Sequence, residues 1–377
     1  MKIAKFFALL ACASFAFVAC ENNEGEQQQT GGNTTGDLTL TADKTAIELG
    51  ESVTFTVMQK DEETGADVDV TKEVTFYDAE LNKLSNPFTP TTSGSINVTA
   101  TKGKYTSNTV TVTVMAQMPE LPADPQPENL AFNHRAVLID HTGVNCGYCP
   151  NATDNLIALS KTEWHKHYNE VTCHAGGYAT GDPANSAAAN ALSQFQGPKS
   201  FPTIMINFYN KTSDYLSNSI INVLQNVVME DGADAGISLA VAGDNTTIYC
   251  AAQVKAAQSK EYKVVAWLLE SGIYSPNQSG ATKDYHKIYN YALRNISGEY
   301  SRNNVAGESI GVLEAGQTYD CAFTLPIVST KWNWENMGVL VIVSAKDANN
   351  RWEVVNSAYC ALGEGGVAAS KAYEYVE

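Results

Sequence analysis

The chain has 377 residues, of which 44% are hydrophobic, and its formal net charge is −17 at pH 7. This length is enough for two or three domains. The acidic balance argues against binding of nucleic acid and against a polybasic contact with a membrane surface. Beyond the N-terminal segment, no apolar run approaches the roughly 18 residues that a membrane-spanning helix needs.

Residues 1–19 predict a lipoprotein signal peptide. Lys2 and Lys5 precede the apolar stretch FFALLACASFAFV, which is too short to span a bilayer. The segment ends in FVAC and is similar to a lipobox, in which the signal is cleaved before the cysteine and the new N-terminus is acylated, as with palmitate. Ordinary secretory cleavage is the alternative. The polar residues 20–37 fit a flexible tether behind a lipid anchor on Cys20.

Residues 38–115 predict a small all-β module. The stretch LTLTADKTAIELGESVTFTV alternates apolar and polar residues and places Val53, Phe55 and Val57 on one face. Several short strands in so few residues favour an immunoglobulin-like sandwich, which we interpret as a spacer. Residues 116–130 are rich in proline and predict a semi-rigid linker.

Residues 131–235 change to an α/β pattern. The strand pattern HRAVLID runs into HTGVNCGYCP and is followed by a helical stretch, a strand around EVTCH and a second helical stretch. A further strand opens at Phe201–Pro202, and an amphipathic helix closes the region. This order predicts a sheet covered by helices, with a thioredoxin-like arrangement.

Residues 236–362 return to β patterning and predict a second, C-terminal all-β sandwich, followed by a tail at 363–377. Hairpins are expected to turn at residues 243–245 and at 347–350. The aromatic residues of this region can form either a binding face or a packed core, and they include Trp267, Trp332, Trp334 and Trp352. The chain is therefore expected to be multidomain.

Cys146 and Cys149 form a Cys-x-x-Cys pair at the predicted strand-to-helix junction. The dipole of the following helix favours a thiolate on Cys146, and Cys149 is close enough to resolve a mixed disulfide. Pro202 is expected to form a cis peptide bond opposite the pair, where it would shape a substrate groove. His174 is positioned either to tune Cys146 or simply to satisfy a loop.

Two other uses of the cysteine pair are less compatible with the sequence. Attachment of a c-type haem needs histidine after the second cysteine, but that residue is Pro150. A zinc site would need Cys146, Cys149, Cys173 and His174 together, yet no second Cys-x-x-Cys is present and an oxidising compartment favours a disulfide. We expect no metal and no cofactor. A static disulfide and thiol-disulfide exchange both stay open, and so does the question of whether the chain is an enzyme.

Several motifs over residues 130–362 resemble one known family, the outer-membrane-protein-28-related lipoproteins of Bacteroidetes. The motifs are GVNCGYCPNA, CHAGGYATGDP, GPKSFPT, WENMGVLVIVSAKDANNRWEVVNSA, and YHKIYNYALRNISGEY with His286, Leu293 and Arg294. The resemblance implies a thioredoxin-like domain followed by a β-sandwich, anchored by lipid at the outer membrane and often surface-exposed. It also implies adhesion or host-surface binding as a function. The module at 38–115 is then an addition to the shared core.

These observations lead to a preferred function and an alternative. The preferred function is surface display or binding of a protein or glycan ligand by a lipid-anchored protein of the outer membrane, with Cys146–Cys149 mainly a disulfide. The alternative is a cell-envelope thiol-disulfide oxidoreductase, with Cys146 as nucleophile and Cys149 as resolving thiol. The sequence leaves undecided which of the other cysteines pair, and these are Cys173, Cys250, Cys321 and Cys360.

Overall fold

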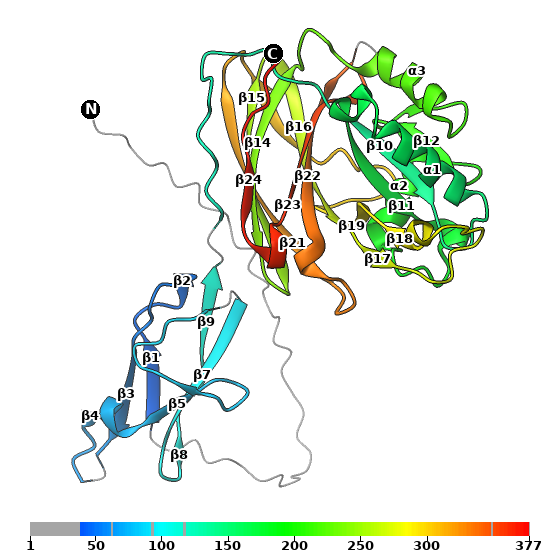
Figure 1. Ribbon diagram of the computed structural model, residues 1–377. Coiled ribbons are helices and arrows are strands. Elements are labelled where there is room, and N and C mark those ends of the chain that lie inside the picture. Colours follow the sequence, from blue (N-terminus) through cyan, green and yellow to red (C-terminus); the bar gives the residue numbers. More distant parts are fainter. Residues whose placement is uncertain (1–37, 62, 92–93, 116–117, 348–349, 377) are drawn as a thin grey trace, which may run out of the picture. The chain divides into compact units, whose positions relative to one another are not determined.

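The computed structural model describes residues 38–376, except 62, 92–93, 116–117 and 348–349 (Figure 1). The predicted signal peptide, the lipidation site Cys20 and the tether at 20–37 lie outside the described residues. The described chain falls into two compact units. The first consists of residues 38–47, 51–89 and 95–113, and the second consists of 114–376 with the short pieces 48–50 and 90–94.

The first unit contains two β-sheets and no α-helix among its described residues. One sheet has the strand order β1-β3-β4 and the other β2-β9-β7-β5-β6, with β8 paired to β7. The strands are β1 Leu38–Ala42, β2 Ala46–Glu48, β3 Phe55–Lys60, β4 Asp67–Asp69, β5 Thr75–Tyr77, β6 Lys83–Leu84, β7 Gly94–Lys102, β8 Tyr105–Thr106 and β9 Val110–Met115. As the alternating pattern predicts, Val53, Phe55 and Val57 are fully buried.

The second unit is organised by one large sheet with the order β13-β12-β10-β11-β19-β16-β22-β23, in which β20 also pairs with β16. Its strands are β10 Ala136–Thr142, β11 Tyr168–His174, β12 Thr203–Ile206, β13 Asn210–Lys211, β16 Lys260–Glu270, β19 Ala292–Ile296, β20 Glu308–Leu313, β22 Met337–Lys346 and β23 Trp352–Ala361. Strand β11 is parallel to both β10 and β19, whereas β12 is antiparallel to β10. The predicted boundary at residues 235 and 236 therefore lies inside one compact unit, because β19 extends the sheet from β11.

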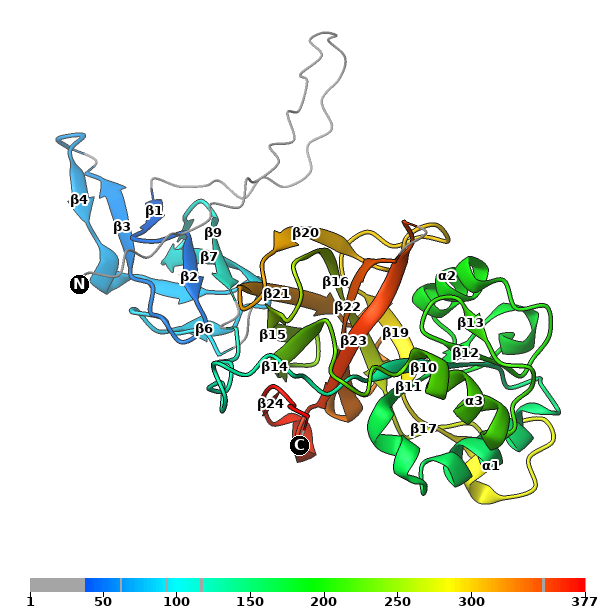
Figure 2. The same cartoon turned by 90° about the horizontal axis from the view of Figure 1, so that it is seen from above.

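Three α-helices cover the β10–β12 end of this sheet, and they are α1 Cys149–Leu159, α2 Ala187–Gln196 and α3 Ser217–Val227. Figure 2 shows α1 and α3 on one face and α2 on the other. The two faces of β10 explain this arrangement. Alternate residues such as Leu138 pack with Leu156 of α1 and Ile220 of α3, while Ile139 packs with Leu192 of α2. Of the described helices, none is both long and apolar enough to cross a membrane.

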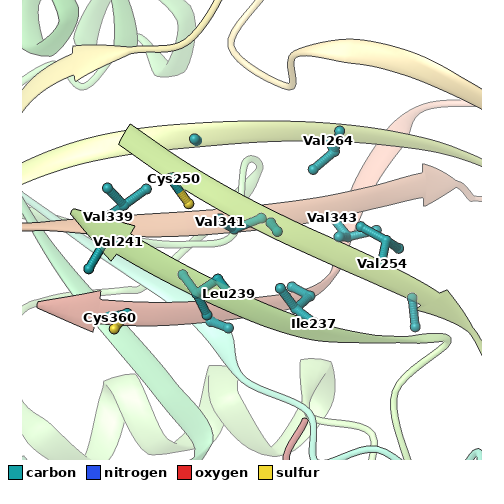
Figure 3. Packing of buried hydrophobic residues seen from close by; sticks show 14 of the residues in the cluster. Ile237, Leu239, Val241, Cys250, Val254, Val264, Val339, Val341, Val343 and Cys360 are labelled. Atoms are coloured by element: carbon teal, nitrogen blue, oxygen red, sulfur yellow. The ribbon is translucent and has the colours of Figure 1, made fainter. Parts of the chain in front are cut away.

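A second sheet, with the order β21-β15-β14-β24, packs on the other end of the large sheet (Figure 3). Its strands are β14 Ala235–Gly243, β15 Thr247–Ala256, β21 Thr318–Pro326 and β24 Ala369–Lys371. Ile237, Leu239 and Val254 meet Val341 and Val343 in the core between the sheets. The predicted hairpins are confirmed, because β14 pairs with β15 and β22 with β23.

Two segments expected outside the domains belong to the second unit. Asp124, in the predicted linker, forms an ion pair with Lys255 at 3.0 Å and accepts a hydrogen bond from the hydroxyl of Tyr375 at 2.6 Å. In the predicted tail, β24 pairs with β14, and Tyr375 stacks beside Phe132 with ring centroids 5.1 Å apart. Burial of these aromatic rings stabilises the packing of both segments on the second unit.

Candidate functional site

Cys146 and Cys149 form a disulfide at the start of helix α1, and both residues are only 2% exposed. The first cysteine lies in the turn between β10 and α1, where its N–H donates to the carbonyl of Gly143. Tyr148 in the same turn is exposed. The sulfur atoms are therefore buried although the turn itself reaches the surface.

The cysteine turn is contacted by residues 275–287, which we name the cover segment. It connects the short strands β17 Ile273–Tyr274 and β18 Ile288–Tyr289 and includes the 3-10 helix η4 Asp284–Lys287. The N–H of Ser279 donates to the carbonyl of Val144 at 2.8 Å, and the Gln278 amide donates to the carbonyl of Cys146 at 3.1 Å. A segment more than 130 residues away in sequence thus completes the surroundings of the disulfide.

The carboxylate of Asp154 on α1 holds the cover segment. It accepts hydrogen bonds from the hydroxyl of Tyr285 at 2.6 Å, from Nε2 of His286 at 2.9 Å and from Lys283 at 2.9 Å. These three hydrogen bonds hold the pKa of Asp154 well below its ordinary value, and the bond from Tyr285 has the largest effect. The N–H of Thr282 donates to Nδ1 of His286, so the ring proton lies on Nε2 and points to the carboxylate.

His174 lies at the end of β11 and is paired with Asp182. Its Nδ1 is 2.8 Å from Oδ2 of Asp182, and the same oxygen accepts the N–H of Val144 at 2.7 Å. Burial raises the pKa of the Asp182 carboxyl, but these hydrogen bonds outweigh it and leave the pKa below its ordinary value. The His174 ring also packs against Tyr289, with centroids 4.3 Å apart. The histidine therefore braces the strand that leads to the cysteine turn, and its tuning of Cys146 stays a prediction.

The residues of the His-Leu-Arg stretch form structural contacts around the same region. Arg294 is buried and forms an ion pair with Glu270 at 2.7 Å, and it also donates to the carbonyl of Pro183 at 2.9 Å. Leu293 lies in the core, and its carbonyl accepts the hydroxyl of Ser186 at 2.6 Å. The motif thus joins the start of α2 to strand β19.

The peptide bond between Phe201 and Pro202 is cis. Phe201 stacks on Tyr178 with centroids 5.1 Å apart, and the carbonyl of Tyr178 accepts the N–H of Asn145 at 2.9 Å. The start of β12 is thus linked to the cysteine turn through one aromatic residue. The role of Pro202 in a substrate groove stays a prediction.

The other cysteines do not join the pair. Cys173, Cys250, Cys321 and Cys360 are all free thiols. Burial raises the pKa of Cys173, whose sulfur lies 3.1 Å from the carbonyl oxygen of Ala189 on α2, away from the α1 side of the sheet. Of the four ligands weighed for zinc, two are joined as a disulfide, and no group of His, Cys, Asp and Glu among the described residues is arranged to hold a metal ion.

Sequence reasoning missed the acidic residues beneath the disulfide. Asp140 on β10 is buried, and it lines the same cavity as Cys149 and Glu170. Burial raises the pKa of Asp140 to about 8 and that of Glu170 to about 7. One feature of the sequence could have indicated this site. Asp140 lies within a strand whose other residues are mostly apolar, and buried acids are uncommon in proteins.

The predicted aromatic face of the sandwich is only partly at the surface. Trp267 is fully buried between the large sheet and α2, beside Phe208. Trp332 and Trp334 are partly buried against the sandwich core, and Trp332 stacks on Arg294 at 5.0 Å. Core packing therefore accounts for Trp267, whereas Trp332 and Trp334 are only partly buried.

Residues 189–364 match the family model of Omp28, described as outer membrane protein Omp28. Among solved structures, HBP35 of Porphyromonas gingivalis is similar at 16% identity over 61% of this chain and 76% of that chain, with a TM-score of 0.49. A domain of the outer membrane lipoprotein Omp28 from the same organism is similar at 16% identity over 35% and 90%, with a TM-score of 0.23. The Yersinia pseudotuberculosis adhesin InvE is similar at 8% identity over 91% and 61%, with a TM-score of 0.19.

With TM-scores under 0.5, these structural likenesses establish neither function nor detailed fold. No curated protein matches the chain. The family match begins in α2 and ends after β23, so it includes the cover segment and the Arg294 ion pair but not the cysteine pair. Residues 189–364, just under half of the chain, thus match an Omp28-related family of outer membrane proteins, which supports a location at the outer membrane of the cell envelope.

Proposed function

We propose that the protein is a lipid-anchored display protein of the outer membrane, which binds a protein or glycan ligand at the cell surface. In this proposal, the Cys146–Cys149 disulfide is a structural link within a thioredoxin-like scaffold. The lipid is carried by Cys20, and residues 38–115 act as an immunoglobulin-like spacer. The family match, with its outer-membrane description, supports the location.

The arrangement around β10 supports a thioredoxin-like scaffold. Parallel strands β10 and β11 and the antiparallel strand β12 are covered by α1 and α3 on one face and by α2 on the other. The disulfide opens α1, and the cis bond before Pro202 precedes β12. A fold of this type does not by itself imply redox activity.

The burial of both cysteines carries the proposal that the disulfide is structural. An exchange catalyst must present its nucleophilic sulfur to a protein disulfide, because the reaction passes through a mixed disulfide. Here each cysteine is 2% exposed, and the cover segment is bonded to the carbonyls of Val144 and Cys146. Such a disulfide stabilises the turn and is poorly placed to react with a folded substrate.

The reduction potential of the Cys146–Cys149 pair in the purified protein tests this role, with Cys146→Ser as control. We expect a potential below about −300 mV and no reduction of a test disulfide, as for structural disulfides. A potential between about −270 and −120 mV, with exchange that the Cys146→Ser variant lacks, would instead identify an oxidoreductase.

Display at the cell surface is tested separately. Metabolic labelling with a palmitate analogue should label the protein and not its Cys20→Ser variant. Protease added to intact cells should then remove the sandwich domains from the labelled protein. Protection of these domains in intact cells, with cleavage only after the outer membrane is opened, would contradict surface display.

A further inference from the structure

A cavity of about 530 Å³ lies beneath the disulfide, between α1, strands β10 and β11, and the segment that runs from η4 to β19. Its walls include Cys149, Leu156 and Ile157 of α1, Glu170 of β11, and Tyr289 of β18. This volume is within the usual range for sites that bind small molecules. The inference drawn from this cavity does not depend on the proposed function.

Two polar groups in the cavity wall have no hydrogen-bond partner in the part of the chain that the structure describes. Asp140 is 2% exposed and Tyr168 is 6% exposed, yet Oδ1 of Asp140 and the hydroxyl of Tyr168 form no hydrogen bond among the described residues. Leaving a buried polar atom unpaired is unfavourable, because the atom loses its hydrogen bonds to water without replacement. Both groups line the cavity, so a ligand that donates and accepts hydrogen bonds there would recover this cost.

A second carboxyl group, that of Glu170, also lines the cavity. Glu170 is two residues from Tyr168 on β11, so both side chains emerge on the same face of the sheet. The parallel register pairs Asp140 with Thr172, the next residue on that face, which places the two acids on adjacent strands. Repulsion from Glu170 contributes to the raised pKa of Asp140, after burial as the main cause.

No basic side chain of the described chain neutralises this pair of acids. Among the residues that line the cavity, Arg135 is bonded to Glu374 at 2.8 Å. Nδ1 of His165 lies 2.8 Å from the carbonyl oxygen of Thr162. His174 is held by Asp182, and His286 is held by Asp154. A cation from outside the protein could therefore pair with the two acids.

Aromatic rings form much of the remaining wall. The tyrosines that line the cavity are Tyr168, Tyr285, Tyr289, Tyr291 and Tyr359. Tyr291 and Tyr359 meet edge to face, with centroids 5.6 Å apart. Tyrosine faces attract organic cations through their quadrupoles and also pack against flat hydrocarbon groups.

We propose that this cavity binds a small organic amine, with its ammonium group between Asp140 and Glu170 and its hydrocarbon body against the tyrosines. The ammonium can donate to both carboxylates and to the hydroxyl of Tyr168, which satisfies the unpartnered groups. Carboxylates at this site would repel an anionic ligand, and a neutral ligand would not offset the charge that each acid gains when it ionises.

The pKa values of the two acids support this assignment. Burial raises the pKa of Asp140 to about 8 and that of Glu170 to about 7, so the empty site is partly protonated near neutral pH. A bound ammonium favours the carboxylates, and binding therefore releases protons. The other titratable or charged groups that line the cavity are Arg135, His165, Tyr168, His174, Tyr285, His286, Tyr289, Tyr291 and Tyr359.

Calorimetric titration of the purified full-length protein with benzylamine tests the proposal. Benzyl alcohol and benzoate serve as neutral and anionic ligands of similar shape. We expect benzylamine to bind at least tenfold more tightly than either, with a heat that changes with the ionisation enthalpy of the buffer because protons are released. Nα-acetyl-lysine amide, titrated in the same way, distinguishes a free arylalkyl amine from a lysine side chain as the source of the ammonium.

Asp140→Asn and Glu170→Gln should each weaken benzylamine at least tenfold and leave the weak binding of benzyl alcohol unchanged. Both replacements are close in shape to the protonated acids, so the fold should persist, as circular dichroism can verify. Asp231→Asn, at an exposed acid outside the cavity, is the matched control. Equal binding of the three ligands, or benzylamine affinity unchanged in both cavity variants, would overturn the proposal.

Discussion

The carboxylate of Asp154, in the middle of helix α1, accepts the Nε2 proton of His286 at 2.9 Å across 132 residues of sequence. The same carboxylate accepts hydrogen bonds from Tyr285 and Lys283. One side chain of the disulfide helix therefore holds three polar groups of the cover segment, from Lys283, Tyr285 and His286. The accessibility of the Cys146–Cys149 disulfide should depend on this contact.

Asp154→Ala should make the disulfide easier to reduce. The variant removes the acceptor of the buried His286 ring and two further hydrogen bonds, so the cover segment should open more often. We expect dithiothreitol to reduce the disulfide about tenfold faster, equivalent to about 1.4 kcal/mol of lost local stability. Thiol titration over time measures the rate. Asp284→Asn, at an exposed acid of the same segment, is the control, and equal rates in the two variants would contradict a holding role for Asp154.

Gly280→Ala should displace the cover segment from the cysteine turn. The added Cβ would clash with the carbonyl oxygen of Gly147, and the backbone φ of 72° is strained for alanine. Gly316 has a φ of 84° with open space around its Cβ position, so Gly316→Ala has the same strain without the clash. Both variants should lose about 1–2 kcal/mol in urea unfolding. Only Gly280→Ala should also speed reduction of the disulfide, and an equal effect of Gly316→Ala would show that the clash is unimportant.

Arg294→Met should strongly destabilise the second unit. It leaves the buried carboxylate of Glu270 without its partner, and removal of one member of a buried ion pair costs about 3–5 kcal/mol. Urea denaturation measures the loss, and the double variant Arg294→Met with Glu270→Gln should recover part of it. Arg351→Met, which breaks an exposed pair with Asp347, should change stability little. If Arg294→Met and Arg351→Met lowered the free energy of unfolding by similar amounts, burial of the Arg294–Glu270 pair would not explain the loss.

Asp140 and Glu170 should weaken the folded state as the pH rises. In the unfolded chain these carboxyls ionise near 3.8 and 4.5, whereas the folded protein holds their protons up to about 8 and 7. Between those limits the folded state binds more protons than the unfolded state, so its free energy of unfolding falls with increasing pH.

The comparison of the wild type with Asp140→Asn isolates this effect. Urea denaturation at pH 5, 6 and 7 should show the variant gaining relative stability with pH, by up to about 1.4 kcal/mol per pH unit. Asp231→Asn should follow the wild type. A constant difference between the wild type and Asp140→Asn across this range would mean that Asp140 is ionised in the folded protein.

Local patterns predicted the elements of the second unit well. The strand HRAVLID corresponds to β10, the cysteine pair opens α1, and the hairpins β14–β15 and β22–β23 turn where loop residues were expected. These features depend on side-chain periodicity and on turn residues, which are local properties of the chain. The apolar spacing of Ile220 and Leu224 likewise predicted a helix packed on the sheet, as α3 is.

The sequence by itself determined the order of strands and helices, the disulfide partners three residues apart, and the buried faces of the sandwich. Only the tertiary structure decided that β19 extends the sheet from β11, that Asp154 binds His286, and that Asp140, Glu170 and five tyrosines line one cavity. The physical reason is distance along the chain. Periodicity specifies which face of an element is apolar, whereas the partner of a buried charge or the cover of a disulfide depends on packing between segments more than 100 residues apart.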